Sequence, residues 1–183
     1  MVTSSDVKVE PQVFINFRGD ELRKTFISHL HKRLQRDGIN AFIDSDEAVG
    51  EELKNLFKRI ENSEIALAVL SSRYTESHWC LQELVKMMEC SMKGEGCNKK
   101  LLVIPIFYKL KIDTVKELDG DFGRNLWDLW RKPGCGRDRD SRIVKWNEAL
   151  KYFLSRNALV FSETGYGLVL GINQYLILLF EFH

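Results

Sequence analysis

The segment Ile65–Leu70 reads IALAVL, an unbroken apolar run of strand length. A strand that is buried on both faces of a parallel sheet has this continuous pattern, whereas a half-exposed strand alternates apolar with polar residues. Two further runs, VFINF at Val13–Phe17 and LLVIPIFY at Leu101–Tyr108, are similarly apolar. We therefore expect all three segments to be strands.

Helical patterns separate these runs. Phe26, Leu30 and Leu34 recur at helical spacing, and Trp79–Met92 has Ser77 as a candidate N-cap. Further helices are expected at 51–62, 122–130 and 143–154, and further strands at 40–44 and 158–161. Strands that alternate with helices predict an α/β fold with a parallel sheet and right-handed crossovers.

Length and composition limit the possible classes of protein. The 183 residues are 44% hydrophobic, enough for one domain with a sizeable core. A formal net charge of +1 gives no support for nucleic-acid binding. The four cysteines lack CxxC spacing and no HExxH motif is present, so no metal site is predicted. Met1–Pro11 lacks a secretory apolar region, and we expect reduced thiols and a cytoplasmic protein, with a nuclear location also possible.

Polar loops follow the carboxyl ends of the predicted strands, which meet at one edge of a parallel sheet where ligands bind. Several sequence segments in and around these loops resemble the plant TIR (Toll/interleukin-1 receptor) domain. They are VFINFRGDELRKTFISHL (Val13–Leu30), AFID (Ala41–Asp44), SSRYTESHWCLQELVKMMEC (Ser71–Cys90), VIPIFY (Val103–Tyr108) and GDFG (Gly120–Gly123). The resemblance implies a flavodoxin-like fold with a five-stranded parallel sheet flanked by helices.

The resemblance also implies an activity: cleavage of the nicotinamide–ribose bond of NAD in plant immune and cell-death signalling, with catalysis that depends on self-association. Glu83, in WCLQEL, matches the family's catalytic glutamate. The matching substrate residues are Arg18, Gly19, Arg23, Asp44, Ser77 and Trp79, and Ser28 and His29 match the pair through which family members associate. NAD or NADP is then the substrate, other TIR domains are the partners, and no cofactor is expected.

Simple chemistry is compatible with this role. Breaking the bond makes an oxocarbenium-like centre that one carboxylate can stabilise, while the neutral pyridine leaves without a general acid. Trp79 and Glu83 are four residues apart on one helix face, where the ring could desolvate the carboxylate. Arg18 could pair with a diphosphate.

Other interpretations stay open. Taken alone, Glu83 would be a solvated helix carboxylate that pairs with Lys86, three residues on. The whole chain could also be a non-catalytic adaptor that acts by TIR–TIR association. A phosphoacceptor receiver domain is disfavoured, because Leu70-Ser71-Ser72 lacks the aspartate that should end the third strand.

The sequence departs from the family pattern in the loop after Asp44, in Lys109–Lys116 and at its end. We divide the chain into an N-terminal disordered segment (1–10), a TIR domain (11–164) and an atypical apolar segment (165–183). Leu168–Phe182 is too short for a membrane span, which needs ~20 apolar residues. It is either a docked or partner-covered element or a liability for solubility.

Overall fold

The chain folds around one parallel β-sheet. The computed structural model describes residues 13–43, 52–92, 97, 99–132, 139–155, 159–161 and 166–181. The strands are β1 (Val13–Phe17), β2 (Ala41–Ile43), β3 (Ile65–Leu70), β4 (Leu102–Tyr108) and β5 (Leu159–Phe161). Their order in the sheet is β2-β1-β3-β4-β5, with every neighbouring pair parallel. The five-stranded parallel α/β fold expected from the sequence is therefore confirmed.

β3 lies at the centre of the sheet, and its side chains explain its apolar run. All six of its residues are buried. Ile65, Leu67 and Val69 pack into the core on one face, while Ala66, Ala68 and Leu70 pack into the core on the other. A strand covered on both faces cannot accommodate the polar positions of an alternating pattern.

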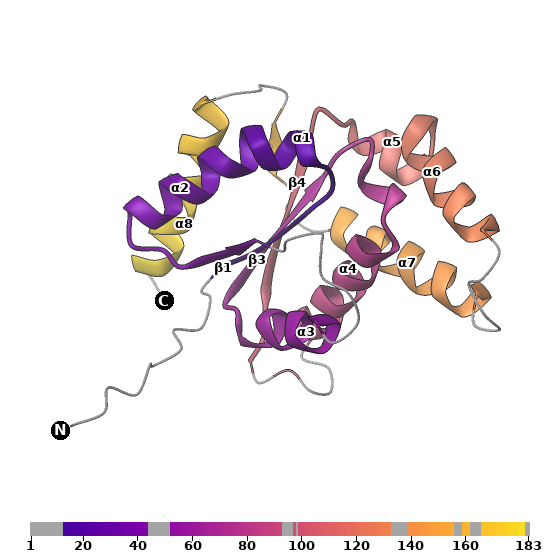
Figure 1. The fold of residues 1–183 in the computed structure, drawn as a ribbon, viewed down its shortest axis with the longest axis horizontal. Coiled ribbons are helices and arrows are strands. Elements are labelled where there is room, and N and C mark those ends of the chain that lie inside the picture. Colours follow the sequence, from indigo (N-terminus) through magenta and orange to yellow (C-terminus); the bar gives the residue numbers. More distant parts are fainter. Residues whose placement is uncertain are drawn as a thin grey trace.

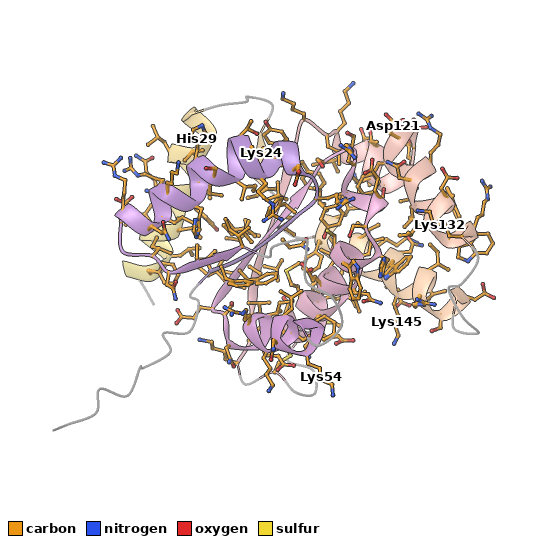
Figure 2. All side chains as sticks on the ribbon, viewed as in Figure 1. Lys24, His29, Lys54, Asp121, Lys132 and Lys145 are labelled. Carbon is orange, nitrogen blue, oxygen red and sulfur yellow. A yellow bond between two sulfur atoms is a disulfide. The ribbon has the colours of Figure 1, made fainter. Side chains whose placement is uncertain are left out.

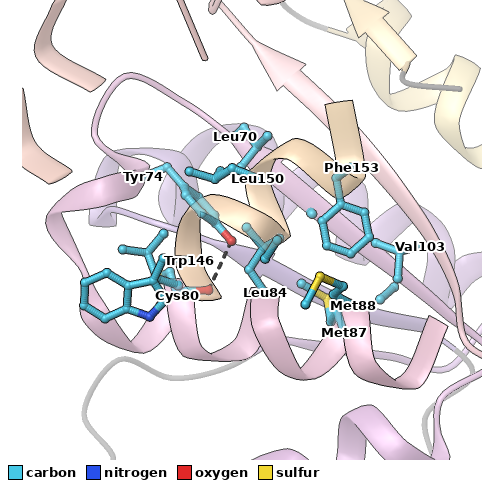
Figure 3. Packing of buried hydrophobic residues seen from close by; sticks show 14 of the residues in the cluster. Leu70, Tyr74, Cys80, Leu84, Met87, Met88, Val103, Trp146, Leu150 and Phe153 are labelled. Atoms are coloured by element: carbon cyan, nitrogen blue, oxygen red, sulfur yellow. Dashed lines mark hydrogen bonds between the residues drawn. The ribbon is translucent and has the colours of Figure 1, made fainter. Parts of the chain in front are cut away.

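Helices cover both faces of the sheet (Figure 1). They are α1 (Asp20–Leu22), the π-helical turn η1 (Arg23–Ile27), α2 (Ser28–Arg36), α3 (Glu52–Asn62), the 3₁₀ turn η2 (Tyr74–Glu76), α4 (His78–Ser91), α5 (Ile112–Glu117), α6 (Gly120–Arg131), α7 (Arg139–Leu154) and α8 (Tyr166–Glu181). The core with α2 and α8 includes Leu30, Leu34, Ile172 and Leu176. The opposite core receives side chains from α3, α4, α6 and α7, including Leu84 and Phe153, which Figure 3 shows at close range.

The apolar C-terminal segment forms α8 and lies beside α2 (Figure 1). Val169, Ile172 and Leu176 are buried on the sheet side of α8. Asn173, a polar interruption of the run, is also buried, and its Nδ2 donates to Asp37 Oδ2 at 2.7 Å. Of the two interpretations left open, docking onto the domain is the one observed. None of the helices that the structure describes has both the length and the apolar character that a bilayer span requires.

The expectation of reduced thiols is wrong for two of the four cysteines. Cys90, at the end of α4, forms a disulfide with Cys97, across a Cα–Cα distance of 5.3 Å. Cys80 is free and buried, and Cys135 lies outside the described residues. The two cysteines are seven residues apart and form no CxxC motif, so no sequence signal pointed to this pair. The pairing depends on the path of the chain between α4 and β4.

Candidate functional site

Glu83 is a buried carboxylate. It lies on α4, and only 2% of its surface is exposed, so it is not the solvated helix carboxylate considered above. Lys86, the alternative partner, instead reaches α3, where its Nζ lies 2.7 Å from Glu61 Oε1. A carboxylate removed from water is costly unless hydrogen-bond donors replace the lost hydration. Glu83 therefore needs partners inside the fold.

Asn16, on β1, provides such a donor. Its Nδ2 lies 2.6 Å from Glu83 Oε2, and its Oδ1 accepts a hydrogen bond from the Tyr74 hydroxyl. Asn16 is 1% exposed and Tyr74 is completely buried. The three side chains come from three separate elements, β1, η2 and α4, which meet at the carboxyl end of the sheet.

Cys80, in the first turn of α4, closes this cluster. Its carbonyl oxygen lies 3.2 Å from the Tyr74 hydroxyl, an interaction drawn in Figure 3, and 3.5 Å from Asn16 Nδ2. Its thiol donates to the carbonyl of Phe17 at 3.3 Å. These bonds attach the start of α4 to the end of β1, so they fix the distance between the helix that carries Glu83 and the strand that carries Asn16.

Ser77 begins α4 as the sequence predicts. Its Oγ accepts from the Cys80 backbone N–H at 3.3 Å, and the residue is 8% exposed. The hydroxyl thus satisfies one of the free N–H groups of the first helical turn. Its observed role is a helix cap, and its contribution to substrate binding stays a prediction.

Trp79 is an exposed member of the predicted site. It retains 40% of its surface, and its ring lies 4.4 Å from that of His78. The desolvation of Glu83 comes from the core around Asn16 and Tyr74 instead, because Glu83 is already buried while the indole stays open to solvent. The free area of the indole is available to a planar ligand. Burial, followed by the nearby charges of Arg142 and Lys132, lowers the pKa of His78, which favours a neutral imidazole beside it.

Arg18 and Gly19 line a small cavity at the carboxyl edge of the sheet. The cavity has a volume of about 140 Å³, and its other lining residues include Ser71, Arg73 and Lys109. Arg18 Nε is buried without a hydrogen bond and lies 4.0 Å from Glu76 Oε2. Polar loops after β1, β3 and β4 therefore meet as predicted, and they bring three cationic side chains to one small space.

Glu76 balances part of this positive charge. Arg73 donates to both of its carboxylate oxygens, at 2.8 and 2.9 Å. Hydrogen bonding from Arg73 lowers the pKa of Glu76, opposed by partial burial and assisted by the charges of Arg73 and Arg18. A carboxylate that stays ionised holds both arginines near the cavity.

Two other predicted positions lie away from this cavity or outside the described residues. The Arg23 guanidinium packs 4.9 Å from the centre of the Phe17 ring, and Arg23 is not among the residues that line the cavity. Asp44 lies in 44–51, outside the described residues, so its role stays a prediction. Among the residues that are described, no three His, Cys, Asp or Glu side chains form a cluster that could hold a metal ion.

Ser28 and His29 begin α2, on the face of the sheet opposite Glu83. Ser28 is partly buried and His29 is exposed. Figure 2 labels His29 on this helix. α8 lies along the same helix. The two predicted association residues thus lie on a surface separate from the Glu83 cluster, and their role in association stays a prediction.

Sequence reasoning missed Asn16 and Tyr74. One signal was available for Asn16: it is the single polar residue of VFINF, and a buried amide almost always has hydrogen-bond partners. Tyr74 gave no comparable signal, because it lies in a polar loop and its burial depends on how η2 folds against α6. Thr75 Oγ1 donates to the carbonyl of Phe122 at 2.6 Å and provides part of that attachment.

Comparison with known proteins agrees with this architecture. The model of the family described as TIR domain matches residues 12–161. Disease resistance-like protein CSA1 of Arabidopsis thaliana is 53% identical over 154 residues, which cover 84% of this chain and 12% of that protein. Disease resistance protein RBA1 of the same plant is 44% identical over 149 residues, which cover 81% of this chain and 38% of RBA1. The chain thus spans well under half of these curated relatives.

The fold also matches a solved structure. The TIR domains of the activated Roq1 resistosome, which directly recognises the pathogen effector XopQ, superpose with a TM-score of 0.74 at 32% identity. The match covers 92% of this chain and 98% of that one. Agreement in both sequence and fold extends over nearly all of the sheet and its helices.

Proposed function

The chain belongs to the TIR domain family, and we propose that it is an NAD glycohydrolase in which Glu83 is the catalytic carboxylate. The observation that carries this proposal is the burial of Glu83 at the carboxyl end of the sheet, with its Oε2 held 2.6 Å from Asn16 Nδ2. NAD or NADP is the substrate, and the products are nicotinamide and ADP-ribose-type signals in plant immunity.

The proposed chemistry uses one carboxylate. As the nicotinamide–ribose bond lengthens, positive charge develops at the anomeric carbon, and an ionised Glu83 stabilises that charge. The bond's electron pair leaves with the pyridine nitrogen, so nicotinamide departs neutral and needs no proton. Water then attacks the anomeric carbon and releases one proton to the solvent. The low dielectric around a buried Glu83 strengthens its attraction to the developing positive charge. The carboxylate is also held in place by the fold before the reaction, so it does not have to reorient.

Other groups are suited to binding the rest of the dinucleotide. Arg18, whose buried Nε makes no hydrogen bond, is suited to a diphosphate together with Arg73 and Lys109 beside it. Trp79 offers an exposed ring on which a base can stack. These roles for Arg18 and Trp79, and those of Gly19, Arg23, Asp44 and Ser77, are parts of the proposal.

The small size of the described cavity favours a site that is completed by association. Pockets for drug-sized ligands usually enclose ~300–1,000 Å³, whereas the cavity beside Arg18 measures about 140 Å³. We propose that contacts between copies, made through Ser28 and His29, bring a second TIR domain to the edge of the site. The protein would then act in the cytoplasm or nucleus as an assembly with itself or with other TIR domains.

The test is nicotinamide release from NAD and NADP across a range of protein concentrations, including a crowding agent. Release per protein is expected to rise with concentration and to disappear in Glu83→Ala. Glu89→Ala is the matched control, since Glu89 lies on the same helix but lines a different cavity, between α3, α4 and α7. Activity that survives in Glu83→Ala, with both variants folded, would refute the assignment of Glu83.

The alternative function is a non-catalytic adaptor. The exposed His29 on α2 favours it, because an association surface can act without catalysis. If no condition gives nicotinamide release, while sedimentation shows self-association that His29→Ala abolishes, the adaptor function is supported and the glycohydrolase is excluded.

A further inference from the structure

The hydrogen bonds behind Glu83 have a fixed direction. The Tyr74 phenol is completely buried, and burial raises its pKa well above the ordinary value, with the nearby Cys80 and Glu83 adding to the effect. The phenol therefore stays protonated at neutral pH and donates. Its acceptors are Asn16 Oδ1 and, at 3.2 Å, the carbonyl oxygen of Cys80.

That direction determines which end of the Asn16 amide faces Glu83. An amide has an acceptor end and a donor end, and they exchange places when the side chain rotates by half a turn. The Tyr74 hydroxyl occupies the acceptor end, so the Nδ2 end is the one left for Glu83 Oε2, 2.6 Å away. The reverse orientation would place Oδ1 against a carboxylate oxygen and leave the Tyr74 proton with one acceptor fewer.

We propose that Tyr74 and Asn16 form a positioning relay, in which the Tyr74 hydroxyl orients the Asn16 amide and the amide holds the Glu83 carboxylate ready for the substrate. The catalytic part of this inference rests on the proposed function. Tyr74 and Asn16 are positioning residues, since they act through Glu83. The relay also links η2 to β1, so the geometry of the carboxylate depends on how η2 is attached to α6 through Thr75 and Phe122.

Other titratable or charged groups near Glu83 can also affect its titration. From α4, the Cys80 thiol donates to the Phe17 carbonyl at 3.3 Å. Arg18 directly follows β1, and its Nε is 4.0 Å from Glu76 Oε2 of η2. The comparison below leaves all of these groups unchanged.

The experiment compares Tyr74→Phe with Tyr152→Phe. Tyr152 is a matched control, because it packs against the same core and its hydroxyl bonds to Ser91 Oγ at 3.1 Å. Both variants remove one phenolic hydroxyl and retain the ring. Titration of the Glu83 side-chain carboxyl is followed by NMR of protein labelled with carbon-13 at glutamate, and Glu83→Gln identifies the signal.

In Tyr74→Phe, the midpoint of the Glu83 titration is expected to move up by about one pH unit, because the ionised form loses an oriented donor. Asn16→Asp, which puts a second carboxylate against Glu83, should move it further in the same direction. Tyr152→Phe should leave the midpoint unchanged. Equal midpoints in wild type and Tyr74→Phe, or equal shifts in the two tyrosine variants, would overturn the relay.

Kinetics then test the catalytic part separately. In Tyr74→Phe, kcat for nicotinamide release should fall about 10- to 100-fold with KM little changed, since the carboxylate is misplaced while substrate contacts remain. An unchanged kcat would refute the positioning role. If the wild type releases no nicotinamide, the proposed function fails, and the NMR midpoints still decide whether the relay holds Glu83.

Discussion

Gly123→Ala is expected to be strongly destabilising, because this glycine allows a close approach of two backbone segments. It lies in the first turn of α6, and an added Cβ would come within 1.5 Å of the Leu118 carbonyl oxygen and 2.3 Å of its carbonyl carbon. Leu118 has a positive φ of 51° at the end of α5, so its backbone is already constrained. The obstacle is backbone, and no flexible side chain can move aside.

The magnitude follows from the displacement required. Real Cβ atoms essentially never come closer than 3.0 Å to another heavy atom, so the two segments must separate by about 1.5 Å. Overpacking a well-filled interior costs ~1–3 kcal/mol and more where backbone must shift, so we expect about 3 kcal/mol. For a domain of this size that corresponds to a Tm about 6–12 °C lower.

Thermal unfolding of wild type, Gly123→Ala and Gly167→Ala measures this effect. Gly167 is the control: it lies in α8, and an added Cβ meets nothing within 4 Å. That variant should be neutral or gain up to ~1 kcal/mol from better helix propensity. If Gly123→Ala unfolds within about 2 °C of wild type, the steric explanation for the glycine in GDFG is wrong.

Two further predictions concern links between elements. Lys86 Nζ and Glu61 Oε1 are 2.7 Å apart, and their side chains are only 12% and 21% exposed. A double-mutant cycle with alanine at both positions, measured by urea unfolding, should therefore give a coupling free energy of about 1 kcal/mol. A coupling near zero would contradict a stabilising ion pair between α3 and α4. Hydrogen bonds from Arg33 and then Asn173 lower the pKa of Asp37 in the folded protein below its ordinary value of 3.8. The ionised side chain should therefore contribute its full stabilisation above the ordinary pKa of 3.8, and this stabilisation should disappear as pH falls through the lower pKa of the folded state. The Tm difference between wild type and Asp37→Asn should therefore be constant from about pH 7 to 5 and shrink toward pH 3, and a difference that grows on acidification would contradict this assignment.

The central fold was predictable because burial dictates composition. The apolar run IALAVL has the length and composition of a strand covered on both sides, and β3 is that strand. Ser77 could be identified as a cap because a hydroxyl before a helical pattern satisfies free N–H groups, and it accepts from the Cys80 N–H. Local chemistry determines both features.

Features that depend on tertiary contacts were less accessible. From its helical spacing alone, Glu83 would be a solvated helix residue. That spacing cannot show that β1 places Asn16 within hydrogen-bond distance of Glu83. The apolar sequence of α8 is compatible with docking on the domain, burial by a partner or an exposed apolar surface. Its contacts with α2, and the hydrogen bond from Asn173 to Asp37, show that it docks on the domain. The Cys90–Cys97 pair likewise depends on the path of the chain after α4.

The most direct test of Glu83 as the catalytic carboxylate separates its charge from its shape. Nicotinamide release from NAD should be measured for wild type, Glu83→Gln and Glu83→Asp at one concentration that supports self-association, with folding checked by Tm. Glu83→Gln retains the shape and can accept from Asn16 Nδ2, but it carries no charge to stabilise the ribosyl cation. We expect its rate to fall by at least ~100-fold, with a smaller loss in Glu83→Asp. A folded Glu83→Gln protein that releases nicotinamide within about threefold of the wild-type rate would contradict the proposed role of Glu83.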